Sequence, residues 1–357
     1  GLMGSTGIPP TEDQPSPAPH LHFEMWSPDG SAYMGQDLTP LESHRLIAQK
    51  FGPDSLPRYA HRIVTAAEAG EPLPETYPPP ELPETGFNVN APSSLTAGTT
   101  FSAPITWDGE DFTHQDFFAL LEGQPLGIIN AGNGAWILGA VPLGAETTKL
   151  NLIVGATDPY GQTLVGNPEI QSVKPDSGPM PLEVPAEVFE LYSDENLQLE
   201  ARTLGQVFLR SLEISEALWD EPFAAPISGD GIRSFGQRIV HGMLRPAHPL
   251  SGVNVAAESG APVLATNAGR VALVQDLPIR GKTIALIHGG GVVSAYAHLA
   301  EATVQAGDNV ARGQPIGSTG QSGTAPRPML RWEMYTAGIA SDPLFWLDQM
   351  LPGRSDG

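Results

Sequence analysis

Cysteine is absent from the 357 residues of this chain. Structural disulfides and thiolate metal sites are therefore excluded. Basic residues are scarce as well, with 18 Lys and Arg against 40 Asp and Glu. This acidic balance disfavours nucleic acid and anionic membrane surfaces as partners, because both repel negative charge. No run of apolar residues reaches about 18, the length that a membrane-spanning helix needs, so we expect no transmembrane segment in this chain.

Glycine and proline, by contrast, are abundant, with 40 and 36 residues respectively. This composition favours β structure with many turns, joined by Pro-rich linkers. The apolar fraction of 40% is high enough to bury substantial cores. The length predicts about two to three domains.

One motif occurs twice, once near each end of the chain: a Gly-Ser-Thr-Gly turn and then a strand Pro-x-Leu-x-aromatic-Glu-Met. The copies differ at the two x positions, which are His20 and His22 in the first copy but Met329 and Arg331 in the second. Residues i and i+2 of a strand point to the same face. His20 and His22 could therefore reach one metal or one substrate, which Met329 and Arg331 cannot. Residue 1 is not Met and already lies close to this motif, so we interpret the chain as a fragment of a longer protein.

Turn signals and hydrophobic spacing divide the chain into modules. Residues 86–172 contain short alternating runs separated by turns, which is typical of an immunoglobulin-like β-sandwich. Residues 223–350 are Gly-rich with many short β runs, which predict an antiparallel sheet. Between them, residues 173–222 are expected to form a linker and a helix whose N-cap is Ser193. We expect the other parts to be the end of a first domain, a helical and Pro-rich linker, and a tail, at residues 1–43, 44–85 and 351–357.

The last module carries several short motifs in a fixed order, at residues 232–238, 252–257, 269–271, 296–299, 304–317 and 342–344. Together they resemble the LytM/lysostaphin-type zinc metallopeptidases, which cleave peptidoglycan cross-bridges. The resemblance implies a mainly β protein, with an antiparallel domain of the duplicated hybrid motif type. In that family a His and an Asp from H-x-x-x-D and one His from H-x-H hold zinc, which leaves a position open for water. Two further histidines assist the metal-bound water or stabilise the oxyanion.

The resemblance places the expected ligand positions on residues that cannot hold zinc. The H-x-x-x-D ligands fall on Leu250 and Asn254. The ligand His of H-x-H falls on Arg331, and the other His of that motif falls on Met329. Leu has no donor atom, Asn is a poor substitute for Asp, and the permanently charged Arg repels the ion. Only His298, in the Tyr-x-His-Leu segment, keeps a family residue. We therefore expect no cofactor in this module, although His248 in a shifted register is an alternative ligand.

The degenerate site is still a candidate binding groove, lined by His298, Arg331, Asn254 and Tyr296. A guanidinium in the place of zinc could bind a carboxylate from the protein or from a peptide ligand. The structural alternative for Arg331 is a salt bridge with a neighbour such as Glu333 or an acidic loop. By the resemblance, His298 would be a catalytic residue of the degenerate site; the structural alternative is a hydrogen-bonded groove residue.

The first copy of the motif shows the opposite pattern. By the same resemblance, His22 would be a zinc ligand and His20 a catalytic residue. No H-x-x-x-D occurs in the chain. A complete zinc site thus needs residues upstream of Gly1 or from another chain, and the structural alternative is that both histidines are vestigial.

The resemblance implies an exported bacterial cell-envelope protein, periplasmic or on the cell surface. We expect its C-terminal domain to be a pseudoenzyme that binds peptidoglycan or an envelope protein and acts as a regulatory module. One alternative is an active zinc endopeptidase with its chemistry in the first domain. Another is a structural component of a surface layer or envelope complex.

Overall fold

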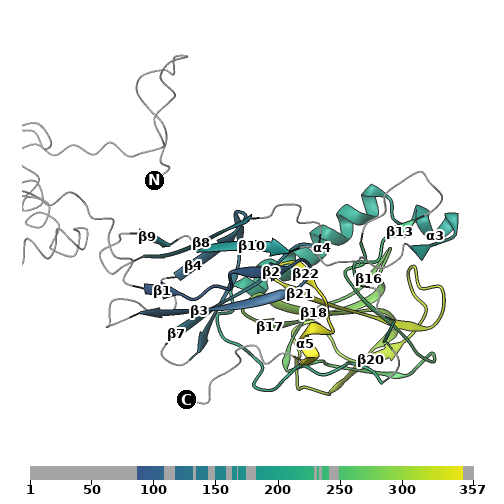
Figure 1. The fold of residues 1–357 in the computed structure, drawn as a ribbon. Helices are drawn as coiled ribbons and strands as arrows, with labels where there is room; N and C mark the ends of the chain where they lie inside the picture. Colours follow the sequence, from purple (N-terminus) through teal and green to yellow (C-terminus); the bar gives the residue numbers. More distant parts are fainter. Residues whose placement is uncertain are drawn as a thin grey trace, which may run out of the picture. The chain divides into compact units, whose positions relative to one another are not determined.

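The computed structural model describes ten stretches of the chain, at residues 87–107, 117–131, 134–143, 149–157, 163–166, 168–173, 182–228, 231–232, 235–240 and 249–348. These residues form mainly antiparallel β structure with one long helix (Figure 1). The predicted mainly β fold is confirmed. No helix among these residues is both long and apolar enough to cross a membrane.

Two sheets that share one apolar core form the N-terminal part of the described structure. The first sheet contains β1 (Phe87–Val89), β3 (Thr100–Trp107), β7 (Gly134–Ala140) and β6 (Gly127–Ala131), in that order. The second contains β2 (Ser94–Thr96), β10 (Glu169–Val173), β8 (Lys149–Thr157), β4 (Phe117–Leu121) and β5 (Gln124–Pro125), with β9 (Thr163–Gly166) beside β8.

Alternation along these strands produces the core. In β3, Phe101, Ala103 and Ile105 are buried, whereas Ser102 and Pro104 are only partly buried. This period of two fits strands with one face toward a partner sheet. The immunoglobulin-like topology stays a prediction, which the strand order of the two sheets supports.

A ten-stranded sheet forms the C-terminal part. Its main path runs through β12 (Gly231–Ile232), β14 (Gly252–Ala256), β21 (Met329–Thr336), β18 (Val292–Ala302), β17 (Gly281–Gly289), β16 (Gly269–Leu277) and β19 (Asn309–Val310). Three further strands pair beside this path, namely β15 (Pro262–Leu264), β20 (Pro315–Thr319) and β22 (Ile339–Ser341). Neighbouring strands in this sheet pair antiparallel, as the sequence predicted. The short helix α5 (Phe345–Asp348) follows.

Strand β21 contributes side chains to both faces of this sheet. Leu330, Trp332 and Met334 enter the main core, together with residues of β14, β17 and β18. The alternate residues, Met329, Arg331, Glu333 and Tyr335, point to the other face because successive side chains of a strand alternate. All of β21 is buried, so its polar residues must find partners within the protein.

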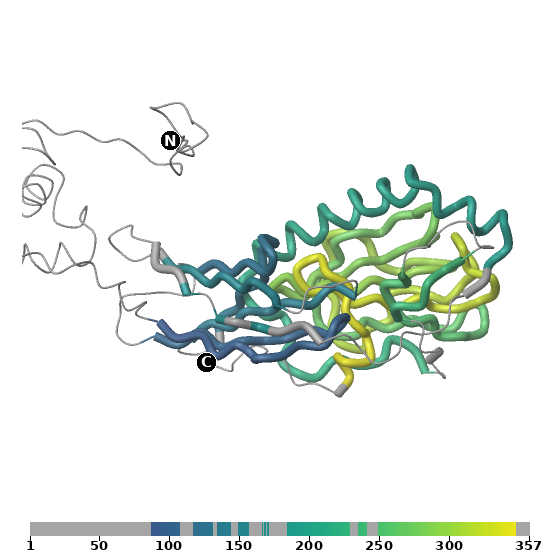
Figure 2. The backbone as a smooth tube through the Cα atoms, turned by 45° about the horizontal axis from the view of Figure 1, so that its top comes forward, coloured from purple at the N-terminus to yellow at the C-terminus, as the bar shows by residue number. Residues whose placement is uncertain are grey.

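Helix α4 (Asp194–Leu212) packs on this second face of the sheet, along β16, β17 and β18 (Figure 2). Its N-cap is Ser193, whose hydroxyl accepts a hydrogen bond from the backbone N of Asn196, as predicted. Val207 packs against an apolar cluster on β17, β18 and β21. The helix is thus part of the packed structure and not an isolated spacer.

The segment before α4 also contacts the sheet. Strand β11 (Leu182–Glu183) pairs with β13 (Ile239–Val240), and α3 (Ala186–Glu190) follows. Tyr192 then places its hydroxyl 3.2 Å from that of Thr324, in the loop that precedes β21. The described residues before α4 are therefore held by β13 and by the loop that precedes β21.

The turn between β17 and β18 of the sheet packs against the sandwich. Gly289, Gly290 and Gly291 all have positive φ, at 91°, 57° and 76°, a region that glycine adopts without strain. A Cβ on Gly127 of β6 would overlap the carbonyl oxygen of Gly290. Ile129 of the sandwich also belongs to the main core of the sheet. The two parts therefore pack backbone against backbone at this joint.

Candidate functional site

Two of the substituted ligand positions lie opposite each other on neighbouring strands. Asn254 on β14 is the cross-strand partner of Arg331 on β21. The Nε–H of Arg331 donates to Oδ1 of Asn254 at 3.1 Å. Both residues are nearly buried, with 6% of Arg331 and 9% of Asn254 exposed. The register thus brings these two positions together, and a guanidinium lies beside the position at which the resemblance expects an Asp ligand.

His298 lies next to this pair, at the point where β18 leaves regular geometry. Its neighbour Ala297 is the cross-strand partner of Arg331. His298 has a φ of 66°, a left-handed conformation that is costly for a residue with a Cβ. Its backbone N donates to the carbonyl oxygen of Arg280 at 2.8 Å. This contact anchors the backbone in its unusual conformation.

The imidazole of His298 is held as a neutral tautomer. Nδ1 lies 2.8 Å from the carbonyl oxygen of Ser322, which can only accept, so Nδ1 carries the proton. Burial, together with the nearby Arg331 cation, lowers the pKa of His298 to about 3. Nε2 is buried without a hydrogen-bond partner in the described part of the chain. The ring therefore presents an unused acceptor beside a cation.

Farther along the same face, Arg280 joins α4 to β21. Its guanidinium forms ion pairs with Glu200 of α4 and, at 2.8 Å, with Glu333 of β21. It also donates to the hydroxyls of Ser251 and Tyr335. Glu333, Tyr335 and Glu200 raise the pKa of Arg280 although its burial acts in the opposite direction. This network fixes the polar face of the sheet two residues from Arg331.

Glu333 is hydrogen-bonded within that network. Its carboxylate accepts hydrogen bonds from Arg280, Ser251 and Tyr335. Burial alone would raise the pKa of Glu333, but Arg280 and Arg331 lower it to about 2. The predicted salt bridge between Arg331 and Glu333 is not formed. Among the described residues, Arg331 instead bonds to the neutral amide of Asn254.

Three other predicted site residues are buried. Leu250 packs with Ile239, in a small cluster that includes residues around α3. Met329 is 5% exposed on β21. Tyr296 belongs to the main core, and its hydroxyl contacts Ser294 and the backbone N of Thr266. This places Tyr296 inside the sheet packing and not in a groove with Arg331.

The residues present at the expected zinc position do not fit a zinc ion. Leu250 offers no donor atom, Asn254 offers a neutral amide, and Arg331 offers only donors and a positive charge. Within the described ranges, no group of three or more His, Cys, Asp or Glu is placed to hold a metal ion. His20 and His22, as well as His248, lie outside the described residues.

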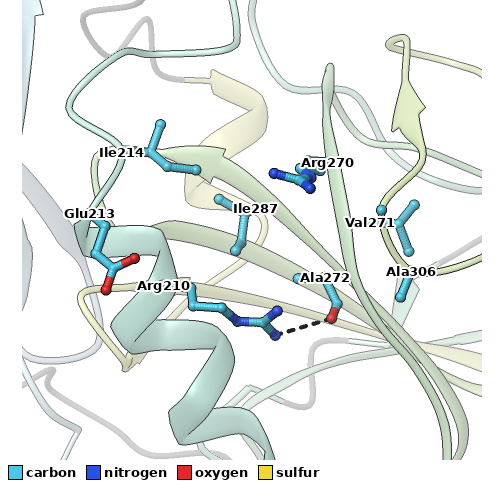
Figure 3. A pocket seen from close by; sticks show the side chains of 9 residues that line it. Arg210, Glu213, Ile214, Arg270, Val271, Ala272, Ile287 and Ala306 are labelled. Carbon is cyan, nitrogen blue, oxygen red and sulfur yellow. Dashed lines mark hydrogen bonds between the residues drawn. The ribbon is translucent and has the colours of Figure 1, made fainter.

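A separate cavity of about 310 Å³ lies between the end of α4 and strands β16 and β17 (Figure 3). Arg210 and Arg270 point toward it, and Arg210 donates to the carbonyl oxygen of Ala272 at 3.1 Å. The sheet order separates this cavity from Asn254 and Arg331, because β18 lies between β17 and β21. It is not part of the predicted site.

Sequence reasoning did not find Glu200 and Arg280. They are 80 residues apart, and neither belongs to a recognised motif. The one sequence signal was an acidic residue on the inward face of the helix, where Glu200, Leu204 and Val207 are buried together. A buried carboxylate on an apolar helix face requires a cation opposite it.

Known proteins share this β-domain topology, which has a polar strand face at its centre. A crystal structure of a peptidase M23 from Pseudomonas aeruginosa aligns with a TM-score of 0.50, over 71% of this chain and 94% of that chain, at 22% identity. This likeness shows the fold alone. Residues 248–343 match peptidase family M23. These residues therefore form a domain of that family, which confirms the LytM-type resemblance.

Curated relatives match the same part of the chain. Cell division protein DipM of Caulobacter vibrioides is 35% identical over 121 residues, 34% of this chain and 19% of the relative. Peptidoglycan DD-endopeptidase ShyA of Vibrio cholerae is 30% identical over 105 residues, 29% of this chain and 24% of the relative. Murein hydrolase activator EnvC of Escherichia coli is 34% identical over 122 residues, 34% of this chain and 28% of the relative. The chain thus covers less than a third of the length of each of these relatives.

Proposed function

We propose that the C-terminal M23 domain of this protein is a pseudoenzyme that binds peptidoglycan peptides or an envelope protein and regulates cell-wall cleavage. The observation that carries this proposal is the hydrogen bond from Arg331 to Asn254, which fills the expected metal position with a guanidinium. The names of the relatives, which include both an endopeptidase and a hydrolase activator, support a cell-wall role. The proposed location is the bacterial cell envelope after export.

The proposed domain organisation follows the same logic. An immunoglobulin-like sandwich at residues 86–172 would precede a linker with a helix at 173–222 and the degenerate M23 domain at 223–350. The shared core between Ile129 and the sheet supports a sandwich that stays attached to the M23 domain. Residues 1–43 would be the end of another M23-type domain, and residues 44–85 a linker.

The test uses the full chain, purified and then incubated with insoluble peptidoglycan. We expect the protein to sediment with the peptidoglycan and to release no peptide through its C-terminal domain. Zinc content is measured in parallel after dialysis against zinc. If peptide is released, and the His298→Ala variant loses this activity while the His22→Ala variant keeps it, then the pseudoenzyme assignment is wrong.

The rival function is an active zinc endopeptidase whose chemistry lies in the first domain. The sequence His20-x-His22 favours it, because this pair matches the H-x-H strand of the resemblance. In that case, loss of bound zinc and of cleavage on His22→Ala is expected. A purely structural role would instead be indicated by stable assembly with a surface-layer component without binding to peptidoglycan.

A further inference from the structure

The guanidinium of Arg331 has more hydrogen-bond donors than the described protein uses. Arginine carries five N–H groups in a planar fork, and among the described residues only its Nε–H has a hydrogen-bond partner, Asn254. The nearest carboxylate along the strand, Glu333, is occupied by Arg280, Ser251 and Tyr335. It therefore acts on Arg331 only at longer range. A nearly buried cation that lacks a carboxylate in direct contact favours an anionic ligand.

His298 adds a second requirement on that ligand. Its Nε2 is buried and without a partner among the described residues, while Nδ1 is bonded to Ser322. An unsatisfied buried polar atom is rare in native proteins and calls for an explanation. Because Nδ1 carries the proton, Nε2 can only accept. A ligand that satisfies both residues must therefore offer acceptor oxygens and a donor close to them.

The two requirements are met by one chemical group. A peptide that ends in a free carboxylate carries two acceptor oxygens and, two bonds from the carboxylate carbon, an amide N–H. The planar fork of arginine suits a carboxylate and binds it in a bidentate manner. An internal peptide segment offers the N–H but no anion, and a C-terminal amide has also lost its charge.

We propose that Arg331 and His298 bind the free C-terminal carboxylate of a peptide, with the carboxylate on the guanidinium and the adjacent amide N–H on Nε2 of His298. This inference rests on the proposed binding function and names the ligand class of that site. Asn254 is a positioning residue here, because its Oδ1 holds Nε of Arg331 and leaves the outer edge of the fork for the ligand.

The test is calorimetric titration of the full chain with acetyl-alanyl-alanine, its C-terminal amide, and the acid whose last amide is N-methylated. We expect the acid to bind at least tenfold more tightly than the amide, because a charged hydrogen-bonded pair is lost in the amide. N-methylation should weaken binding to the wild type, and this effect should vanish in His298→Phe. Equal affinity for acid and amide would overturn the proposal.

Variants with intact folding separate this site from general attraction to cations. Arg331→Gln should lose roughly tenfold to a hundredfold in affinity for the acid, and Arg331→Lys should recover part of it because the charge remains without the fork. The matched control is Arg270→Gln, an exposed arginine at the separate cavity, which should bind the acid as the wild type does. Near-ultraviolet circular dichroism checks that each variant is folded.

Sedimentation with whole peptidoglycan distinguishes the two levels of the proposal. If the wild type and Arg331→Gln sediment equally while the peptide acid is not bound, this inference fails and the proposed binding function stands. If neither the peptide nor whole peptidoglycan is bound, both fail. Loss of both interactions in Arg331→Gln, but not in Arg270→Gln, supports both.

Discussion

Acidification is expected to destabilise the sheet through two buried histidines, His288 and His298. Both are fully buried. Burial lowers the pKa of His288 to about 4 although a hydrogen bond to Ala268 opposes this, and the pKa of His298 falls to about 3. The unfolded chain, with a histidine pKa near 6.5, therefore binds more protons than the folded protein below that pH. The contribution of the two neutral histidines to folding stability is fully present above pH 6.5 and is lost progressively as the pH falls toward 3.

The size of this loss of stability follows from the proton that each imidazole binds in the unfolded chain but not in the folded protein. A difference of one pKa unit corresponds to about 1.4 kcal/mol, so at pH 5 each neutral ring costs about 2 kcal/mol relative to the unfolded chain. Stability at pH 5 should therefore be about 4 kcal/mol lower than at pH 7.5, a large part of the roughly 5–15 kcal/mol of a typical domain. Glu333 does not confound this window, because its own loss of stability lies below its ordinary pKa of 4.5.

The assay is urea unfolding at pH 7.5, 6.5, 5.5 and 5.0, followed by tryptophan fluorescence, since Trp219, Trp332 and Trp346 lie in the main core. His288→Gln and His298→Gln should each be less stable at neutral pH but show about half of the pH dependence. An unfolding midpoint that is unchanged between pH 7.5 and 5.0 would refute the reasoning. So would a double variant that keeps the full pH dependence.

Three further predictions concern the joint, the helix and the lost metal position. Gly127→Ala should destabilise the protein by more than about 1 kcal/mol, because its Cβ overlaps the backbone of Gly290; thermal unfolding measures this, and Gly205→Ala, which meets open space, is the control. Glu200→Ala should cost about 3–5 kcal/mol in the same measurement, because Arg280 loses one of its two buried partners; an unchanged melting temperature would contradict this role. The variant with Leu250→His, Asn254→Asp, Met329→His and Arg331→His restores the three zinc ligands and one catalytic His and should bind zinc at neutral pH; failure to bind zinc while folded would refute our alignment.

The strands of the M23 domain could be predicted because their signals are local. The apolar run at residues 283–288 became part of β17, and the run at 292–298 became part of β18. The pairing of Asn254 with Arg331 was also predictable, but only through the family resemblance, since the register of two strands 77 residues apart has no local signal. The structure then supplied the hydrogen bond that explains why an Asn suits this place.

The polar network and the role of Tyr296 could not be predicted in this way. Tyr296 lies two residues before His298 in the sequence, which suggested that both residues line one groove. The left-handed backbone at His298 breaks the alternation of side chains along β18, so spacing in sequence no longer gives the face. Arg280 lies in the turn between β16 and β17, and its partners on α4 and β21 become neighbours only when the helix packs on the sheet.

The glycine joint between β6 and the β17–β18 turn is not the only contact between the sandwich and the sheet. Thr100 of the sandwich and Thr336 at the end of β21 place their hydroxyls 3.2 Å apart, and the backbone N of Asp342 donates to the carbonyl oxygen of Gly98. The strand that carries Arg331 is therefore hydrogen-bonded at its far end to the sandwich. A substitution in the sandwich at Thr100 acts directly on β21, although it lies far from Arg331 in the sequence.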